Sequence, residues 1–263
     1  MKKYLALFRT SWQVALTYRA SFLMFFVVSV IQTVFLLYLW FAIYDQGGKI
    51  GDYNFQEILT YYLLQFVLNG IVSTFISWDI ITEIKEGGFS NYFLKPIDYF
   101  RWQATINYAS KIVEILFIIV GVGIASFFLF REFVLPPASG LMLFHMVILT
   151  LLATLLSFIL EFLIGMAAFW ITEAFSFKFL TMTITRFFAG NILPLSLLPV
   201  PLIVASQFTP FPYLSYVPVQ IYLGRITDIG SAYIGIVFWI ILLYFTARWV
   251  YRMGIKKYEA VGS

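Results

Sequence analysis

Six long apolar runs constrain this chain more than any other feature of its sequence. A helix needs about 20 apolar residues to cross the hydrocarbon core of a bilayer, and each run is near that length. We therefore expect an all-α integral membrane protein that forms a single domain over residues 1–263. The expected spans lie at about 20–44, 58–78, 106–130, 141–172, 177–200 and 229–250.

The composition agrees with a membrane protein and excludes several other classes. Hydrophobic residues make up 62% of the chain and charged residues 11%, with a mean hydropathy of +0.90. Soluble domains carry about 25% charged residues. The absence of cysteine excludes disulfides, thiolate metal sites and a cysteine nucleophile. The pI near 9.1 is better explained by lysine and arginine gathered on one side of the membrane than by nucleic-acid binding.

The distribution of basic residues predicts the orientation. With both termini inside, thirteen lysines and arginines fall on the inner side and three on the outer side. The positive-inside rule therefore places the termini in the cytoplasm. The outer three are Lys49, Arg131 and Arg225, Arg186 falls within a span, and the inner thirteen are Lys2, Lys3, Arg9, Arg19, Lys85, Lys95, Arg101, Lys111, Lys178, Arg248, Arg252, Lys256 and Lys257.

The N-terminal segment has apolar residues at helical spacing before the first span. This pattern predicts a helix that lies in the headgroup plane; the alternative is a frayed tail. The residues are Tyr4, Leu5, Phe8, Trp12, Ala15 and Leu16.

The loop at about 79–105 carries the densest group of charges. Span two is expected to continue as a helix past Asp79, and Gly87-Gly88 should end it, because glycine accepts a left-handed conformation. A short second helix of about two turns, with exposed aromatic side chains, should follow, and Asp98 should cap the third span. The segment is either a docking element for a partner or a solvated loop. Its candidate residues are Glu83, Lys85, Glu86, Gly87, Gly88, Phe89, Tyr92, Phe93, Lys95 and Pro96.

Polar residues recur every four positions along the second span. Steps of four advance only about 40° beyond a full turn, so the side chains form one slowly winding stripe. The stripe either lines a translocation path or binds neighbouring helices together. It consists of Tyr61, Gln65, Asn69, Ser73 and Ser77.

Two charged residues lie within spans four and five. If these spans form a hairpin that turns near residues 172–174, Glu161 and Arg186 lie at similar depth and are expected to pair. The pair is either a structural salt bridge or part of a gate. The prediction that the two residues pair is wrong if span four ends near Gly165. His145, the only histidine, is expected to be interfacial, and no metal site is expected.

Prolines interrupt the segment at about 191–225, so it cannot form one regular helix. We expect short re-entrant or surface helices at the outer end of a path; a plain extracellular loop is the alternative.

Two segments carry a resemblance to a known family. Gly87 to Tyr92, followed by Leu94-Lys95-Pro96, resembles the Gly-x-x-x-x-Tyr-x-Leu-Arg/Lys-Pro pattern in the cytoplasmic loop of type-2 ABC transporter permeases. The prolines of the later segment, which resembles the one between spans five and six of that family, are Pro194, Pro199, Pro201, Pro210 and Pro218.

The resemblance implies the membrane-spanning permease subunit of a bacterial ABC exporter, placed in the cytoplasmic (inner) membrane. The segment at 83–96 would be the coupling helix that docks a cytoplasmic ABC ATPase, and spans two and five would line the path for a drug, peptide or lipid-like substrate. A second permease, identical or related, would complete the complex.

The chain itself lacks a phosphate-binding loop, because Gly47-Gly48-Lys49-Ile50 is its nearest approach to that motif. ATP and Mg²⁺ would therefore be bound by the partner ATPase, and this chain is not expected to be an enzyme or to bind a cofactor. The alternative functions are an ion-coupled secondary transporter or channel and, with less support, a membrane-embedded enzyme.

Overall fold

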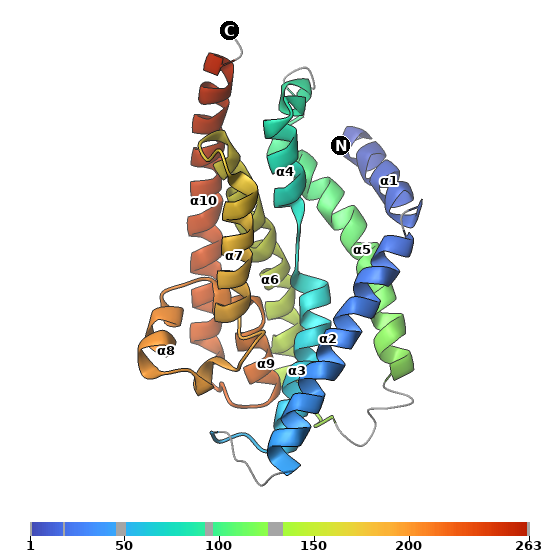
Figure 1. Ribbon diagram of the computed structural model, residues 1–263, viewed down its shortest axis with the longest axis vertical. Coiled ribbons are helices and arrows are strands. Elements are labelled where there is room, and N and C mark those ends of the chain that lie inside the picture. The colour runs from blue at the N-terminus through green and yellow to red at the C-terminus, as the bar shows by residue number, and fades with distance from the viewer. Residues whose placement is uncertain (1, 18, 46–50, 93–96, 126–133, 262–263) are drawn as a thin grey trace.

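The computed structural model describes residues 2–17, 19–45, 51–92, 97–125 and 134–261, which are helical with short connections and contain no strand (Figure 1). The longer helices are α1 (Lys2–Thr17), α2 (Arg19–Asp45), α3 (Phe55–Val72), α4 (Ile76–Lys85), α5 (Tyr99–Ala125), α6 (Gly140–Met166), α7 (Ala174–Phe188) and α10 (Ile229–Val261). Shorter ones are η1 (Gly88–Tyr92), η3 (Ala167–Phe169), η4 (Leu195–Leu197), α8 (Val200–Gln207), η5 (Phe211–Leu214) and α9 (Tyr216–Tyr222).

The chain runs back and forth along the long axis of the molecule. Both termini and the connection from α4 to α5 lie at one end, and the connection from α6 to α7 lies at that end as well (Figure 1). Both ends of the chain therefore lie at one end of the molecule, as termini on one side of a membrane require, and the side that this end faces stays a prediction. The other end holds α9 and the start of α10 (Figure 1).

Five segments of the described chain are long and apolar enough to cross a membrane: Phe26–Asp45, Phe55–Lys85, Tyr99–Val120, Gly140–Phe169 and Ile229–Tyr258. The expected count of six full spans is not confirmed. The return between α6 and α10 begins with α7, whose 15 residues make a helix of about 22 Å. The short helices η4, α8, η5 and α9 complete it in the lower half of the view in Figure 1.

The second span is not one continuous helix. It breaks at residues 73–75, between α3 and α4. Just beyond the break, α4 lies against α6 so closely that a Cβ atom on Gly165 would come within 2.8 Å of the Ile80 side chain. A larger residue at this position would separate the two helices.

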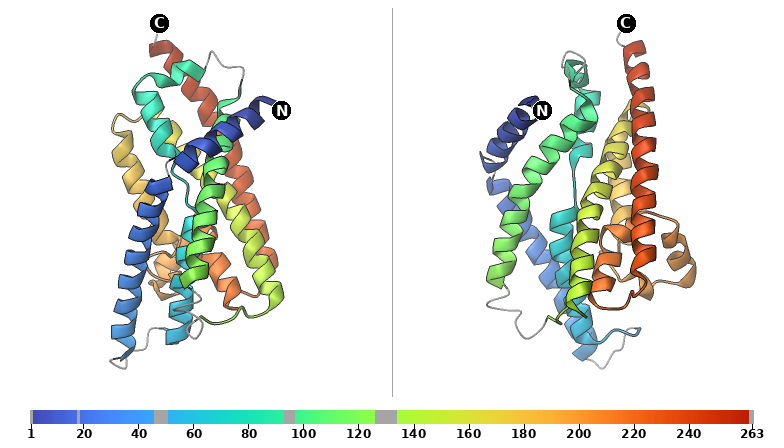
Figure 2. Two further views of the ribbon diagram at one scale, coloured as in Figure 1. Left: turned by 90° about the vertical axis from the view of Figure 1, so that its right-hand side faces the viewer. Right: turned by 180° about the vertical axis from the view of Figure 1, so that it is seen from behind.

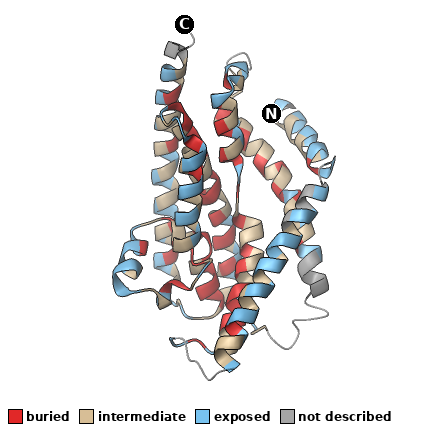
Figure 3. Cartoon of the chain, viewed as in Figure 1, coloured by how far each residue is buried: buried red, intermediate tan, exposed pale blue. Residues whose placement is uncertain are grey.

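The core lies along α6, which packs against α4, α9 and α10. Buried residues are concentrated there, whereas α2 is largely exposed (Figure 3). Only 6% of the apolar window of α2 is buried within the chain, so this helix faces lipid or another subunit.

Helix α1 packs across α5 (Figure 2), and the side chain of Phe8 is only partly exposed. The expected N-terminal helix is therefore present.

Candidate functional site

The connection from α4 to η1 forms a compact projection at the end that holds the termini (Figure 1). We call residues 85–92 the tip. Helix α4 ends at Lys85, and Gly87 follows with a φ of +79°, the left-handed conformation that commonly ends a helix. The predicted glycine stop is therefore confirmed. The described part of the short helix that follows, η1, is a 3₁₀ helix of five residues, and the rest of the expected two turns lies outside the described residues.

Phe89 anchors the tip and is not an exposed knob. Its side chain is fully buried, and its ring lies 4.9 Å from that of Tyr99, 5.2 Å from Phe169 and 5.4 Å from Tyr258. The expectation of exposed aromatic side chains is wrong for Phe89, because α5, η3 and α10 converge on it and remove its apolar ring from water. Phe93, Lys95 and Pro96 lie outside the described residues.

A hydrogen-bonded cluster around Glu83 fixes the tip to α5. The Tyr92 hydroxyl donates to one Glu83 carboxylate oxygen at 2.7 Å, and the Tyr99 hydroxyl donates to the other. Gln103 donates to Tyr99 at 2.8 Å. Burial, followed by the hydrogen bond to Glu83, raises the pKa of Tyr92 above its ordinary value. Tyr92 therefore stays protonated and remains a donor at neutral pH.

The surface of the tip is polar. One positive and one negative side chain, Lys85 and Glu86, stand beside the short polar side chains of Ser90 and Asn91. Such a surface suits contact with a soluble partner rather than with lipid. The exposed residues are Lys85, Glu86, Gly87, Ser90 and Asn91.

Asp98 joins the start of α5 to α10. Its carboxylate accepts a hydrogen bond from the backbone N–H of Arg101 at 3.0 Å, which confirms the predicted cap. Nη1 of Arg248 donates to both carboxylate oxygens of Asp98, at 3.0 and 2.8 Å. Asp98 therefore also links α5 to the last helix, which the sequence did not reveal.

Four residues of the polar stripe bond to other parts of the same chain through their side chains. The Tyr61 hydroxyl donates to the Gly190 carbonyl at 2.7 Å. Gln65 donates to the same carbonyl at 3.5 Å and to Tyr61 at 3.0 Å. The Asn69 side chain accepts from Asn191 at 2.8 Å.

Tyr61, Gln65 and Ser77 are buried, whereas Asn69 and Ser73 are partly exposed. The three buried residues are explained by their role in packing helices together. Only the two partly exposed residues, Asn69 and Ser73, are placed to line a translocation path.

Glu161 pairs with Lys178, so the predicted pair with Arg186 is wrong. Nζ of Lys178 contacts a carboxylate oxygen of Glu161, and the Lys178 side chain is 1% exposed. The Ser77 hydroxyl donates to the other oxygen at 2.5 Å. The pair therefore connects α4, α6 and α7.

The reason for the changed partner is the position of the hairpin. Helix α6 ends at Met166 and α7 begins at Ala174, so the turn is centred earlier than expected. Lys178 then lies near the depth of Glu161. Arg186 lies eight residues further along α7, about 12 Å away, and is exposed.

Lys111 is a second buried cation, which the sequence counts among the inner basic residues at the start of the expected span 106–130. It lies within the span Tyr99–Val120, with a side chain that is 6% exposed. Its Nζ contacts the carboxylate of Glu114 and the backbone carbonyl of Ser73. That carbonyl belongs to the break between α3 and α4, so Lys111 supplies a partner for a backbone acceptor freed by the break. Lys111 and Lys178 are therefore removed from the count of basic residues on the inner side. Eleven lysines and arginines remain on the inner side and three on the outer side.

The opposite end of the molecule is held by polar contacts as well. Arg225 donates to Glu57 at 2.9 Å and stacks over the ring of Tyr53 at 3.9 Å. His145 lies 3.1 Å from the Tyr233 hydroxyl. Among the described residues, no three His, Cys, Asp or Glu side chains come together as metal ligands.

One comparison with known proteins identifies a family. A family model described as ABC-2 family transporter protein matches residues 20–262. A search of the curated proteins finds no match. The family match covers every long helix except α1.

Proposed function

We propose, from the premise that the chain belongs to the ABC-2 family of transporter proteins, that it is the permease subunit of an ATP-driven exporter. In this proposal the tip docks a separate cytoplasmic ABC ATPase, which binds ATP and Mg²⁺. A second permease, identical or related, pairs with this chain in the bacterial cytoplasmic membrane. The substrate is amphipathic or hydrophobic, such as a drug, peptide or lipid-like molecule.

The observation that carries the proposal is the combination of a polar tip surface with a buried aromatic anchor. A force on Lys85 or Glu86 reaches Phe89, which is fully enclosed by the bundle. The Glu83 carboxylate holds the same segment to α5, and the Tyr258 hydroxyl donates to the Gly87 carbonyl at 3.1 Å. The tip therefore moves together with α4, α5 and α10, as a coupling element must.

The buried ion pair extends this connection toward α7. Ser77 lies on α4, near the break in the second span, and bonds to Glu161 on α6. Glu161 in turn holds Lys178 on α7. We propose that displacement of α4 by the ATPase is transmitted along this chain of contacts. The short α7 and the broken α3–α4 span supply the segments that rearrange.

A charge swap at the tip tests the docking proposal. The double substitution Lys85→Glu with Glu86→Lys keeps the net charge and alters only exposed side chains. We expect it to abolish co-purification with the cognate ATPase, best sought in the neighbouring gene, and to abolish ATP-dependent transport in proteoliposomes. Lys257→Glu, an exposed change on α10, is the control and should leave the complex intact. An intact complex with unchanged transport in the swapped variant would refute the coupling assignment.

The proposed path runs along α3 to the break that follows it, where the partly exposed Asn69 and Ser73 interrupt an apolar wall. We expect Asn69→Leu to lower transport or to alter basal ATPase activity while the permease still assembles, as judged by size-exclusion chromatography. The change also removes the acceptor for Asn191. If the variant fails to assemble, the stripe serves only to pack helices.

An ion-coupled secondary transporter is the second candidate, and the buried charges on α5, α6 and α7 favour it. Lys111, Glu114, Glu161 and Lys178 all lie in or beside the spans, where ionisable groups mark ion or proton pathways. The two functions differ in their energy source. Transport by the purified chain alone, driven by an imposed ion gradient and abolished by an ionophore, would support this candidate and refute the exporter.

A further inference from the structure

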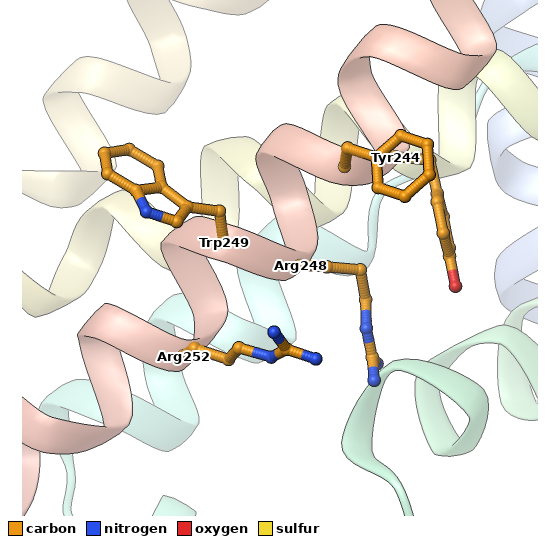
Figure 4. Close-up of a pocket in the computed structure, with 5 residues that line it drawn as sticks. Tyr244, Arg248, Trp249 and Arg252 are labelled. Atoms are coloured by element: carbon orange, nitrogen blue, oxygen red, sulfur yellow. The ribbon is translucent and has the colours of Figure 1, made fainter.

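The C-terminal half of α10, at the end of the molecule that is expected to face the cytosol, carries a hollow in which aromatic and arginine side chains meet. Its volume is about 380 Å³, and it is lined by Tyr244, Phe245, Arg248, Trp249 and Arg252. The side chains of Arg248 and Arg252 extend to the same side of the helix (Figure 4). The geometry points to a binding site for the headgroup of an anionic phospholipid in the inner leaflet, a site that does not depend on the proposed transport function.

The depth of the hollow matches the headgroup region. Helix α10 begins at Ile229, at the end of the molecule opposite the termini. With a rise of about 1.5 Å per residue, Trp249 lies about 30 Å along the axis, which is the thickness of the hydrocarbon core. Tryptophan is enriched at that boundary. Arg252 lies about one turn further, at the level of the phosphates.

The order of side chains along the hollow matches the order of groups in a phospholipid. Tyr244 and Phe245 lie on the membrane side, beside Ile241, and all three are exposed, so they are placed to contact acyl chains. Arg248 and Arg252 follow toward the cytosol. A soluble protein partner would leave the apolar half of the hollow without a matching surface.

The charge of the hollow favours an anionic lipid over a zwitterionic one. Arg248 is paired with the Asp98 carboxylate, so these two residues together add no net charge to the hollow. Arg252 has no ionic partner among the described residues, so a net charge of about +1 remains. Arg248 donates to Asp98 only through Nη1, which leaves its other N–H groups available to a phosphate. Basic pockets on the cytoplasmic side of spans bind anionic headgroups in this manner.

Native mass spectrometry of the purified chain, supplied with equal amounts of phosphatidylglycerol and phosphatidylcholine, tests the site. The wild type should retain more phosphatidylglycerol. Arg252→Gln should lower that retention roughly fivefold, since each basic residue near the surface contributes on the order of 1 kcal/mol. Lys257→Gln removes the same charge outside the hollow and should change nothing. Equal retention of the two lipids, or equal losses in the two variants, would overturn the proposal.

Fluorescence provides a second readout that localises the lipid. Phosphatidylglycerol with brominated acyl chains should quench the protein more than brominated phosphatidylcholine does, and Trp249→Phe should remove that difference. Inorganic phosphate at millimolar concentration should not displace the lipid. Displacement by phosphate, or a quenching difference that persists in Trp249→Phe, would contradict a lipid site at this position.

Discussion

At the scale of single residues, the least expected feature is the burial of two lysines among apolar helices. An unpaired charge in this environment is expensive, so each lysine depends on its partner. Lys178 has Glu161, and Lys111 has Glu114 together with the Ser73 carbonyl. The sequence places both lysines near the inner ends of the expected spans at 106–130 and 177–200, which is why it assigns them to the inner surface.

Removal of Lys178 should therefore be far more damaging than removal of Arg186. Lys178→Met leaves Glu161 buried without a counter-charge, a loss on the order of 3–5 kcal/mol. We expect a large drop in the melting temperature of the detergent-solubilised protein, partly restored by adding Glu161→Gln. Arg186→Met alters an exposed residue of the same helix and should have little effect. Equal destabilisation by the two methionine variants would contradict the observed pairing.

At the scale of elements, the tip is defined by how α4 ends. The left-handed Gly87 turns the chain so that Phe89 points into the bundle, with only ordinary backbone geometry at Gly88. The two neighbouring glycines therefore have different roles, which the sequence Gly87-Gly88 does not distinguish.

Alanine substitutions at the two glycines should separate these roles. A Cβ atom on Gly87 meets no neighbour within 4 Å, so the cost of Gly87→Ala comes from its φ of +79°, about 1–2 kcal/mol. Gly88→Ala needs no such conformation and meets its nearest atom at 3.7 Å. We expect only Gly87→Ala to lower thermal stability and ATPase association. A larger loss in Gly88→Ala would show that space, not backbone conformation, restricts the tip.

At the scale of the whole molecule, the tip and the C-terminal part of α10 lie at one end and the α9–α10 connection at the other (Figure 1). The excess of basic residues at the first end predicts that it faces the cytoplasm. The orientation stays a prediction, and it is accessible to labelling because the chain contains no cysteine.

Single cysteines should reveal which end is outside. We expect Thr227→Cys to react with a membrane-impermeant maleimide in intact cells, and Ser90→Cys and Lys256→Cys to react only after the membrane is opened. All three positions are exposed, so differences in labelling report the side of the membrane. Labelling of Ser90→Cys in intact cells would invert the topology and remove the basis for a cytoplasmic docking partner.

The sequence by itself determined the membrane class, five of the six expected spans, the position of the tip, its glycine stop and the Asp98 cap. These features depend on local properties, namely run length, residue conformation and hydrogen bonds to nearby backbone groups. Only the tertiary structure decided that Phe89 faces inward, that Glu161 holds Lys178, and that α7 is too short to span alone. The physical reason is that partner choice depends on where helices end and how they are rotated against each other, and a shift of a few residues at one hairpin selects a different cation.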